Sequence, residues 1–299
     1  MPFRPSAALL VLAAVLTVSP VQAYCITHSL DPAQSQCQCL ELGKPAAWHT
    51  SELSYGFNEA AFPGLPDEQL RATVAASFET WQSVTCDGKS IGFHITELPG
   101  TTTLQEGPGA DEPNENVITH YDAAGWEDKL YSPLAFAITA VWLDKKTGQI
   151  YGADIGLNGG MDRFGDCLTQ SCCLIACKSD SLKTDLQNVL THEIGHFLGL
   201  SHSDTDPRAT MSCTASAGDV DKRTLEPDDI AGICAAYPTS SAFPDDEPKL
   251  PDGGTKSGGS HHHGCSLARG GRSTTLDLSV LGLLSALLVL RRRNKLRAA

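Results

Sequence analysis

Positive charge is scarce in most of this chain. Residues 24–264 contain 14 lysines and arginines against 34 aspartates and glutamates, an excess of 20 negative charges. Such a surface cannot replace the counterions of a phosphate backbone, so nucleic acid is excluded as a partner. Long apolar runs are missing too, because residues 7–18 and 278–290 fall short of the roughly 20 residues that a membrane-spanning helix needs.

Cysteine, in contrast, is abundant, with 11 in 299 residues. This usage is unusual in reduced cytosolic enzymes and indicates an oxidising compartment. The N-terminus agrees, because Arg4, an apolar stretch and the small-x-small triplet at 21–23 are typical of a secretory signal peptide. We therefore predict a signal peptide over residues 1–23 and an exported chain that starts near Tyr24, located at the cell surface or outside the cell.

Ten cysteines lie in the body of the exported chain, which allows up to five disulfides. Those in a Cys-containing N-terminal segment, residues 24–44, could pair locally or with Cys86. Cys213 and Cys234 could tie the last helical segment to the region before it. The cysteines at 167–177 could form a second metal site, but disulfides are the commoner use in an exported chain.

The C-terminal part has two segments of different character. Residues 239–264 are rich in Pro, Gly, Ser and Asp, and predict a flexible linker. Residues 265–299 combine Cys265 with an apolar run and the basic cluster 291–297, which would hold that end in the cytoplasm. This tail resembles the sorting signal of myxobacterial surface proteins. The resemblance implies membrane association through the tail and a sorting role for Cys265, with an ordinary tail anchor as the alternative.

The region between the ends carries helical and strand patterns in an order that suggests an α+β fold. Apolar periodicity and capping signals predict three helices, over residues 67–84, 184–198 and 226–236. A capping box at Thr184 and Gln187 would start the second of them. Short β-rich runs predict strands over residues 91–95, 116–121, 135–143 and 150–157, with a hairpin turn at 145–148.

The segment His-Glu-Ile-Gly-His-Phe-Leu-Gly-Leu-Ser-His, residues 192–202, carries the chemistry. His192 and His196 are one helical turn apart, so both imidazoles can face one ion. Gly199 can adopt a left-handed conformation and turn the chain so that His202 approaches the same ion. Three neutral imidazoles leave one zinc position open for water, and Glu193 is placed to take that water's proton as general base.

Two other interpretations compete with a catalytic zinc site. The histidines could be incidental surface residues of a helix, but the full motif is very improbable by chance. A surface adhesion or binding module could instead retain the zinc without turnover. The presence of Glu193 favours the enzyme over that alternative.

Residues 192–203 resemble the matrixin branch of the metzincin metalloproteases. Ser203 stands where astacins have Glu and reprolysins have Asp, and Met211 is at the family's usual distance for the Met turn below the zinc. Similar segments at 78–81, 152–155 and 228–233 extend the resemblance to residues 45–238, which we expect to form the catalytic domain.

This resemblance implies a metzincin-type zincin, with a twisted mixed sheet, an active-site helix and a small C-terminal subdomain that contains the Met turn. It implies a zinc-dependent endopeptidase with one catalytic zinc ion and a protein or peptide substrate. The substrate would pair with an antiparallel edge strand. We assign that strand to residues 151–157, with Tyr151, Gly152, Ala153, Asp154 and Ile155 as the binding residues.

The chain also departs from the family pattern. Ser212 and Cys213 follow Met211 in place of the Tyr-Pro that shapes the matrixin specificity wall, so the side-chain preference stays open. A Pro-Arg-Cys-Gly switch is missing, so we do not expect prodomain latency of the usual kind. Asp154, Asp162 and Asp166 could bind calcium, although solvated loop carboxylates are the commoner case.

Overall fold

The computed structural model describes residues 24–32, 38–58, 65–104, 107, 115–161, 164–168, 183–203, 206–238, 243, 259–263 and 266–267. The predicted signal peptide, Cys265 and the apolar and basic parts of the tail lie outside these residues. The described residues belong to one compact unit within residues 1–267. Among them, no helix is both long and apolar enough to cross a bilayer.

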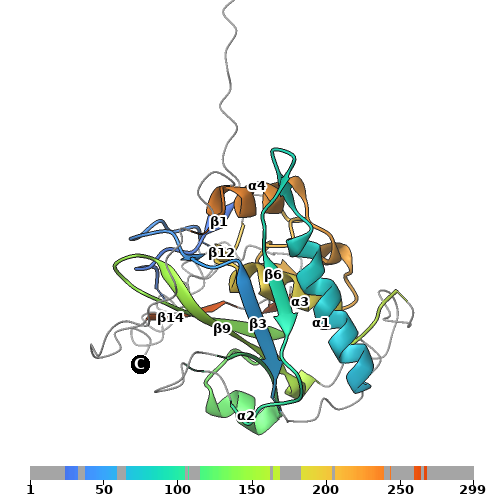
Figure 1. Ribbon diagram of the computed structural model, residues 1–299. Helices are drawn as coiled ribbons and strands as arrows, with labels where there is room; N and C mark the ends of the chain where they lie inside the picture. The colour runs from blue at the N-terminus through green and yellow to red at the C-terminus, as the bar shows by residue number, and fades with distance from the viewer. Residues whose placement is uncertain are drawn as a thin grey trace, which may run out of the picture. The chain divides into compact units, whose positions relative to one another are not determined.

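A seven-stranded mixed sheet forms the centre of this unit (Figure 1). Its strands follow the order β14-β8-β9-β7-β3-β6, and β2 also pairs with β9. The pairs among β2, β3, β6, β7 and β9 are parallel, whereas β8 is antiparallel to β9 and β14 is antiparallel to β8. The bounds are β2 Ala47–Trp48, β3 Glu52–Phe57, β6 His94–Glu97, β7 Asn116–Tyr121, β8 Ala137–Leu143, β9 Gln149–Asn158 and β14 Gly259–His263. A mostly parallel sheet of this kind agrees with the expected fold class.

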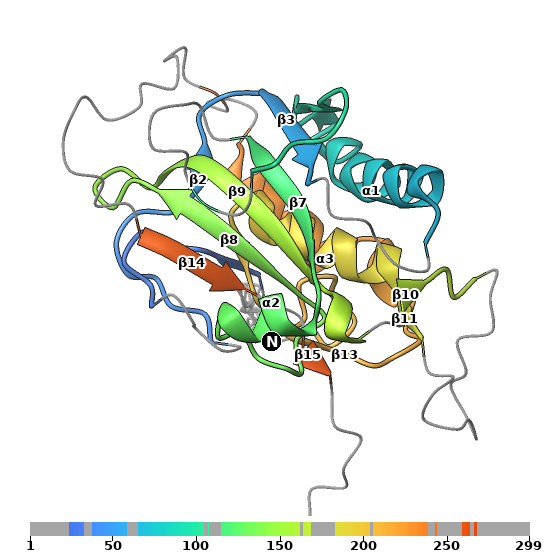
Figure 2. The same cartoon turned by 90° about the horizontal axis from the view of Figure 1, so that it is seen from below.

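Helices α1 (Asp67–Gln82) and α3 (Leu186–Phe197) pack together on one face of the sheet (Figures 1 and 2). α1 buries Leu70, Val74, Phe78 and Trp81, which recur at helical spacing. The Phe78 ring stacks on Tyr55 of β3 at 4.5 Å and meets Phe197 of α3 edge-on at 5.4 Å. This aromatic contact fixes α3 against both α1 and the sheet. The other helices are α2 (Ala123–Asp128), α4 (Pro227–Ala236), and the 3-10 helices η1 (Gly159–Met161) and η3 (Asp221–Arg223).

The position of β9 corrects one expectation. Residues 151–157 were expected to be the antiparallel edge strand, but β9 is hydrogen-bonded to β8 on one side and to β7 on the other. Its backbone groups are therefore already used, and the antiparallel strand is β8. The alternating sequence shows that a segment is a strand, but not how many neighbours it has.

The remaining strands are short and pair two by two. They are β1 (Cys25–Ile26) with β12 (Leu200–Ser201), β4 (Thr85–Cys86) with β5 (Lys89–Ser90), β10 (Phe164–Gly165) with β11 (Thr184–Asp185), and β13 (Thr214–Ala215) with β15 (Ser266–Leu267). β14 and β15 flank residue 265, so the segment that we expected to be a flexible linker includes a strand at 259–263.

One local and one long-range disulfide join segments of the unit. Cys25 is bonded to Cys39, which is a local pairing of the kind expected. Cys234 is bonded to Cys86, 148 residues earlier, and so anchors α4 to the hairpin after α1. The pairing of Cys213 with Cys234 is therefore wrong, although Cys213 is itself disulfide-bonded.

Candidate metal centre

The helix that carries the motif begins at a charged cap. Asp185 Oδ1 accepts a hydrogen bond of 2.8 Å from the Asn188 N–H, and its carboxylate also pairs with the Arg223 guanidinium. Asp185 is completely buried, so this pair fixes the helix start within the core. The predicted capping box at Thr184 and Gln187 is replaced by this aspartate.

The chain turns sharply after the motif helix, between the second and the third histidine. α3 ends at Phe197, and Gly199 has φ of +91°. A Cβ at Gly199 would lie 2.6 Å from the Ala46 carbonyl oxygen, so both the conformation and the space require glycine. The turn leads into β12 and brings His202 back toward the helix, as the motif predicted.

The structure brings the three predicted ligands together. The Nε2 atoms of His192, His196 and His202 lie 3.2, 3.2 and 3.3 Å apart, and all three side chains are buried. Among the residues that the structure describes, these three histidines are the one group of three or more His, Cys, Asp or Glu side chains whose ligand atoms are close enough to hold one metal ion.

Backbone carbonyls orient two of the imidazoles. His192 Nδ1 lies 2.6 Å from the Thr210 carbonyl oxygen, and His196 Nδ1 lies 2.8 Å from that of Leu200. A carbonyl can only accept, so we assign the proton of each ring to Nδ1 and leave both Nε2 lone pairs facing inward. Converging lone pairs repel one another unless a cation lies between them, which is the arrangement of a metal site.

The spacing of these nitrogens fits zinc. Zinc–nitrogen bonds of 2.0–2.1 Å in a tetrahedron place neighbouring ligand atoms about 3.3–3.4 Å apart. The observed spacings of 3.2–3.3 Å agree with that geometry. Burial and the nearby charge of Lys222 lower the pKa of His202 to about 3, so its imidazole is in the neutral form that metals bind.

Glu193 lies beside the histidines and is held by β8. Its side chain is completely buried, and the Thr139 hydroxyl lies 2.6 Å from Glu193 Oε2 and 3.1 Å from the Glu193 carbonyl oxygen. Thr139 is also buried, in a strand of otherwise apolar residues. Sequence reasoning missed this residue, and its only signal was a hydroxyl within an apolar run.

Met211 packs beneath the motif helix. A Cβ at Gly195 would lie 2.1 Å from Met211 Sδ, which shows how closely this side chain approaches the turn between His192 and His196. Asp229, at the start of α4, accepts hydrogen bonds from the backbone N–H groups of Thr210 and Met211 at 2.8 and 2.9 Å. These contacts hold the Met211 segment, and with it the carbonyl that orients His192, against the centre.

Two of the three acidic residues expected as calcium candidates, Asp154 and Asp166, have other partners. The Asp154 carboxylate is buried and accepts hydrogen bonds from the Val117 N–H, the Trp142 Nε1–H and the Gly107 N–H. Asp166 pairs with Arg223, and Asp162 lies outside the described residues. Asp154 thus joins β9 to its neighbours, and the structure adds no support for calcium.

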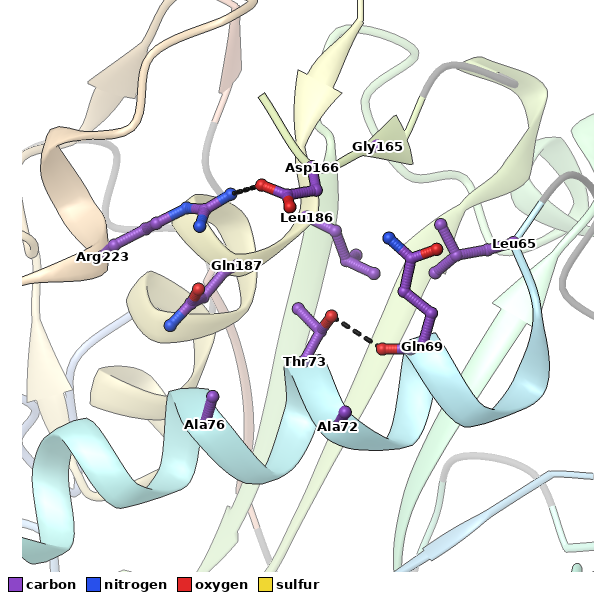
Figure 3. A pocket seen from close by; sticks show the side chains of 10 residues that line it. All are labelled: Leu65, Gln69, Ala72, Thr73, Ala76, Gly165, Asp166, Leu186, Gln187 and Arg223. Carbon is purple, nitrogen blue, oxygen red and sulfur yellow. Dashed lines mark hydrogen bonds and ion pairs between the residues drawn. The ribbon is translucent and has the colours of Figure 1, made fainter. Parts of the chain in front are cut away.

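A separate cavity of about 200 Å³ lies between α1 and the start of α3 (Figure 3). Its walls include Gln69 and Thr73 of α1, and the ion-paired Asp166 and Arg223. The three histidines and Glu193 do not line it. The cavity is therefore distinct from the candidate metal centre.

A family model and one known protein each match a part of the chain. The family model described as Matrixin matches residues 110–238, which include the three histidines, Glu193 and Met211. Human matrilysin is 44% identical over 57 residues, which are 19% of this chain and 21% of matrilysin. The match thus spans about a fifth of that relative. Both comparisons support a matrixin-like metalloprotease, whereas the predicted sorting tail lies outside the family match.

Proposed function

We propose that this chain is a zinc-dependent endopeptidase of the matrixin type. The observation that carries this proposal is the convergence of three buried imidazole nitrogens beside the buried carboxylate of Glu193. When bound by His192, His196 and His202, zinc supplies a Lewis acid that makes water more acidic and polarises a carbonyl group.

The residues of the chain have separate roles in this proposal. Glu193 accepts a proton from the attacking water and passes it to the amine that leaves when the peptide bond breaks. Thr139 keeps the Glu193 carboxylate in place through the hydrogen bond of 2.6 Å. Met211 is the residue of the Met turn, since it packs on the helix below the histidines. Because Thr139 holds the Glu193 carboxylate in one orientation, Glu193 needs little reorientation to transfer protons during the reaction.

The substrate in this proposal is a protein or peptide in extended conformation. β8 is antiparallel to β9 and carries Thr139, so a peptide paired with its outer edge would pass directly beside Glu193. Backbone pairing of this kind gives affinity with little dependence on side chains. β8 thus takes the role that we first assigned to residues 151–157.

Turnover distinguishes the endopeptidase from a binding module on the same scaffold. Zinc-loaded protein should cleave a quenched peptide library, and a chelator should abolish the cleavage. Glu193→Ala should retain zinc, because Glu193 is not a ligand, and lose about 10²–10⁴-fold in rate. Equal cleavage by the wild type and by Glu193→Ala would refute the endopeptidase and leave the binding module. So would the absence of cleavage by the wild type and by every variant of it.

We also propose export and surface delivery. The signal pattern over residues 1–23 supports export, and the disulfides agree with an oxidising compartment. Cys265→Ser should reduce surface retention, measured by cell fractionation, without changing peptidase activity. Equal retention of both forms would remove the sorting role of Cys265.

A further inference from the structure

The chain's own C-terminal segment lies on the outer edge of β8. β14 (Gly259–His263) pairs antiparallel with β8, and its five residues run from opposite Leu143 to opposite Thr139 (Figure 2). On its other side β8 is paired with β9. Both rows of hydrogen-bonding groups of β8 are therefore in use.

β14 ends beside the proposed catalytic base. His263 is the residue opposite Thr139, whose hydroxyl contacts Glu193. Paired residues in adjacent antiparallel strands are about 4.5–5.5 Å apart between Cα atoms. The backbone at position 263 is therefore next to the residue whose hydroxyl contacts the Glu193 carboxylate.

The same segment then pairs with the strand that follows Met211 in the chain. β15 (Ser266–Leu267) runs parallel to β13, with Ser266 opposite Thr214 and Leu267 opposite Ala215. β13 begins three residues after Met211, the residue that packs beneath the histidines. Two residues separate β14, which pairs with the strand that carries Thr139, from β15, which pairs with the strand that follows Met211.

We propose that β14 and β15 occupy the substrate position and act as an intramolecular competitor of the substrate. This inference rests on the proposed endopeptidase function, because a peptide substrate needs the same edge of β8. One row of backbone N–H and C=O groups can pair with only one strand at a time. The segment and the substrate therefore exclude each other.

The composition of β14 favours reversible binding. Its sequence, Gly-Ser-His-His-His, lacks Val, Ile, Thr, Tyr, Phe and Trp, the residues that are enriched in strands. We therefore expect backbone pairing and the tether to the domain to hold the strand. The tether is the segment that precedes β14, residues 239–258. Such a tether provides an effective concentration of about 1 mM. Pairing with a dissociation constant near 0.1 mM would therefore suppress activity about tenfold.

Proline substitutions in β14 test the competition in the full chain. Neighbouring N–H groups of a strand point to opposite sides, so His261→Pro with His262→Pro removes one that faces β8. We expect this variant to show a kcat/KM about tenfold above the wild type on a quenched peptide. Gly253→Pro with Gly254→Pro, in the preceding segment, is the matched control and should behave as the wild type. A synthetic peptide of residues 257–268 should inhibit the activated variant by raising KM at constant kcat.

Hydrogen exchange provides a readout that does not depend on activity. Amides of β8 should exchange faster in the proline variant than in the wild type or the control. If all three proteins cleave equally, above Glu193→Ala, and protect β8 equally, the competitor role is refuted and the endopeptidase stands. If β8 is deprotected but no form exceeds Glu193→Ala, the endopeptidase fails and the competitor role fails with it.

Discussion

Gly195 offers a direct test of how the metal centre is supported from below. A Cβ at this position would lie 2.1 Å from Met211 Sδ and 2.9 Å from Trp81 Cζ2, closer than real contacts allow. Trp81 has little freedom to move, because its Nε1 donates a hydrogen bond of 2.8 Å to the Thr191 carbonyl oxygen. In Gly195→Ala the Met211 side chain must therefore give way.

The magnitude follows from two opposing terms. Alanine is better than glycine within a helix by about 0.5–1 kcal/mol. Overpacking a dense core costs about 1–3 kcal/mol, and the contact with Met211 Sδ places Gly195→Ala in the upper part of that range. We expect a net loss of about 1–2 kcal/mol in the free energy of unfolding.

Urea unfolding of the zinc-free protein measures this loss as a lower midpoint at constant m value. Gly125→Ala is the control, because its Cβ would be 3.2 Å from its nearest neighbour, Asp122 Oδ1. Combining Gly195→Ala with Met211→Ala should cost less than the sum of the single changes, since the smaller residue makes room. A Gly195→Ala protein as stable as the wild type would refute the packing described here.

Two further predictions concern residues that hold the centre in place. Thr139→Val should lower kcat by about 10–100-fold with little change in KM, because a hydrogen bond to a charged group contributes roughly 1.5–3 kcal/mol. Thr139→Ser keeps the hydroxyl and should restore most of the rate. An unchanged kcat in Thr139→Val would exclude a positioning role for Thr139. Asp229→Asn should lower the free energy of unfolding, measured by urea denaturation, by about 2–3 kcal/mol. The reason is that the asparagine amide group presents a donor to backbone N–H groups that need acceptors. An unchanged midpoint would contradict the role of Asp229.

Local patterns predicted several of the elements, although β3 (Glu52–Phe57) was not among the expected strands and the strand expected over residues 91–95 overlaps β6 by two residues only. The expected strand over residues 116–121 has the bounds of β7, and the helix expected over 67–84 is α1, two residues shorter at its end. The histidine motif also specified the centre, because helical spacing and one glycine turn determine where the three imidazoles lie. These features depend on residues close together in the chain.

Long-range pairing could not be predicted in the same way. The sequence of β9 is equally suited to an edge or an interior strand, and only the arrangement of β7 and β8 decides between them. The role of Thr139 depends on the approach of β8 to α3, 54 residues later in the chain. β14 has no strand pattern of its own and forms against an existing edge, so its composition indicated only a linker.

X-ray absorption at the zinc edge of the purified full chain measures which atoms of the protein bind the metal. We predict one zinc per chain, with three imidazole nitrogens at about 2.0–2.1 Å and a light atom in the fourth position. His202→Ala should remove one of these nitrogens from the spectrum. A sulfur ligand at about 2.3 Å, or a spectrum unchanged in His202→Ala, would contradict a three-histidine catalytic site.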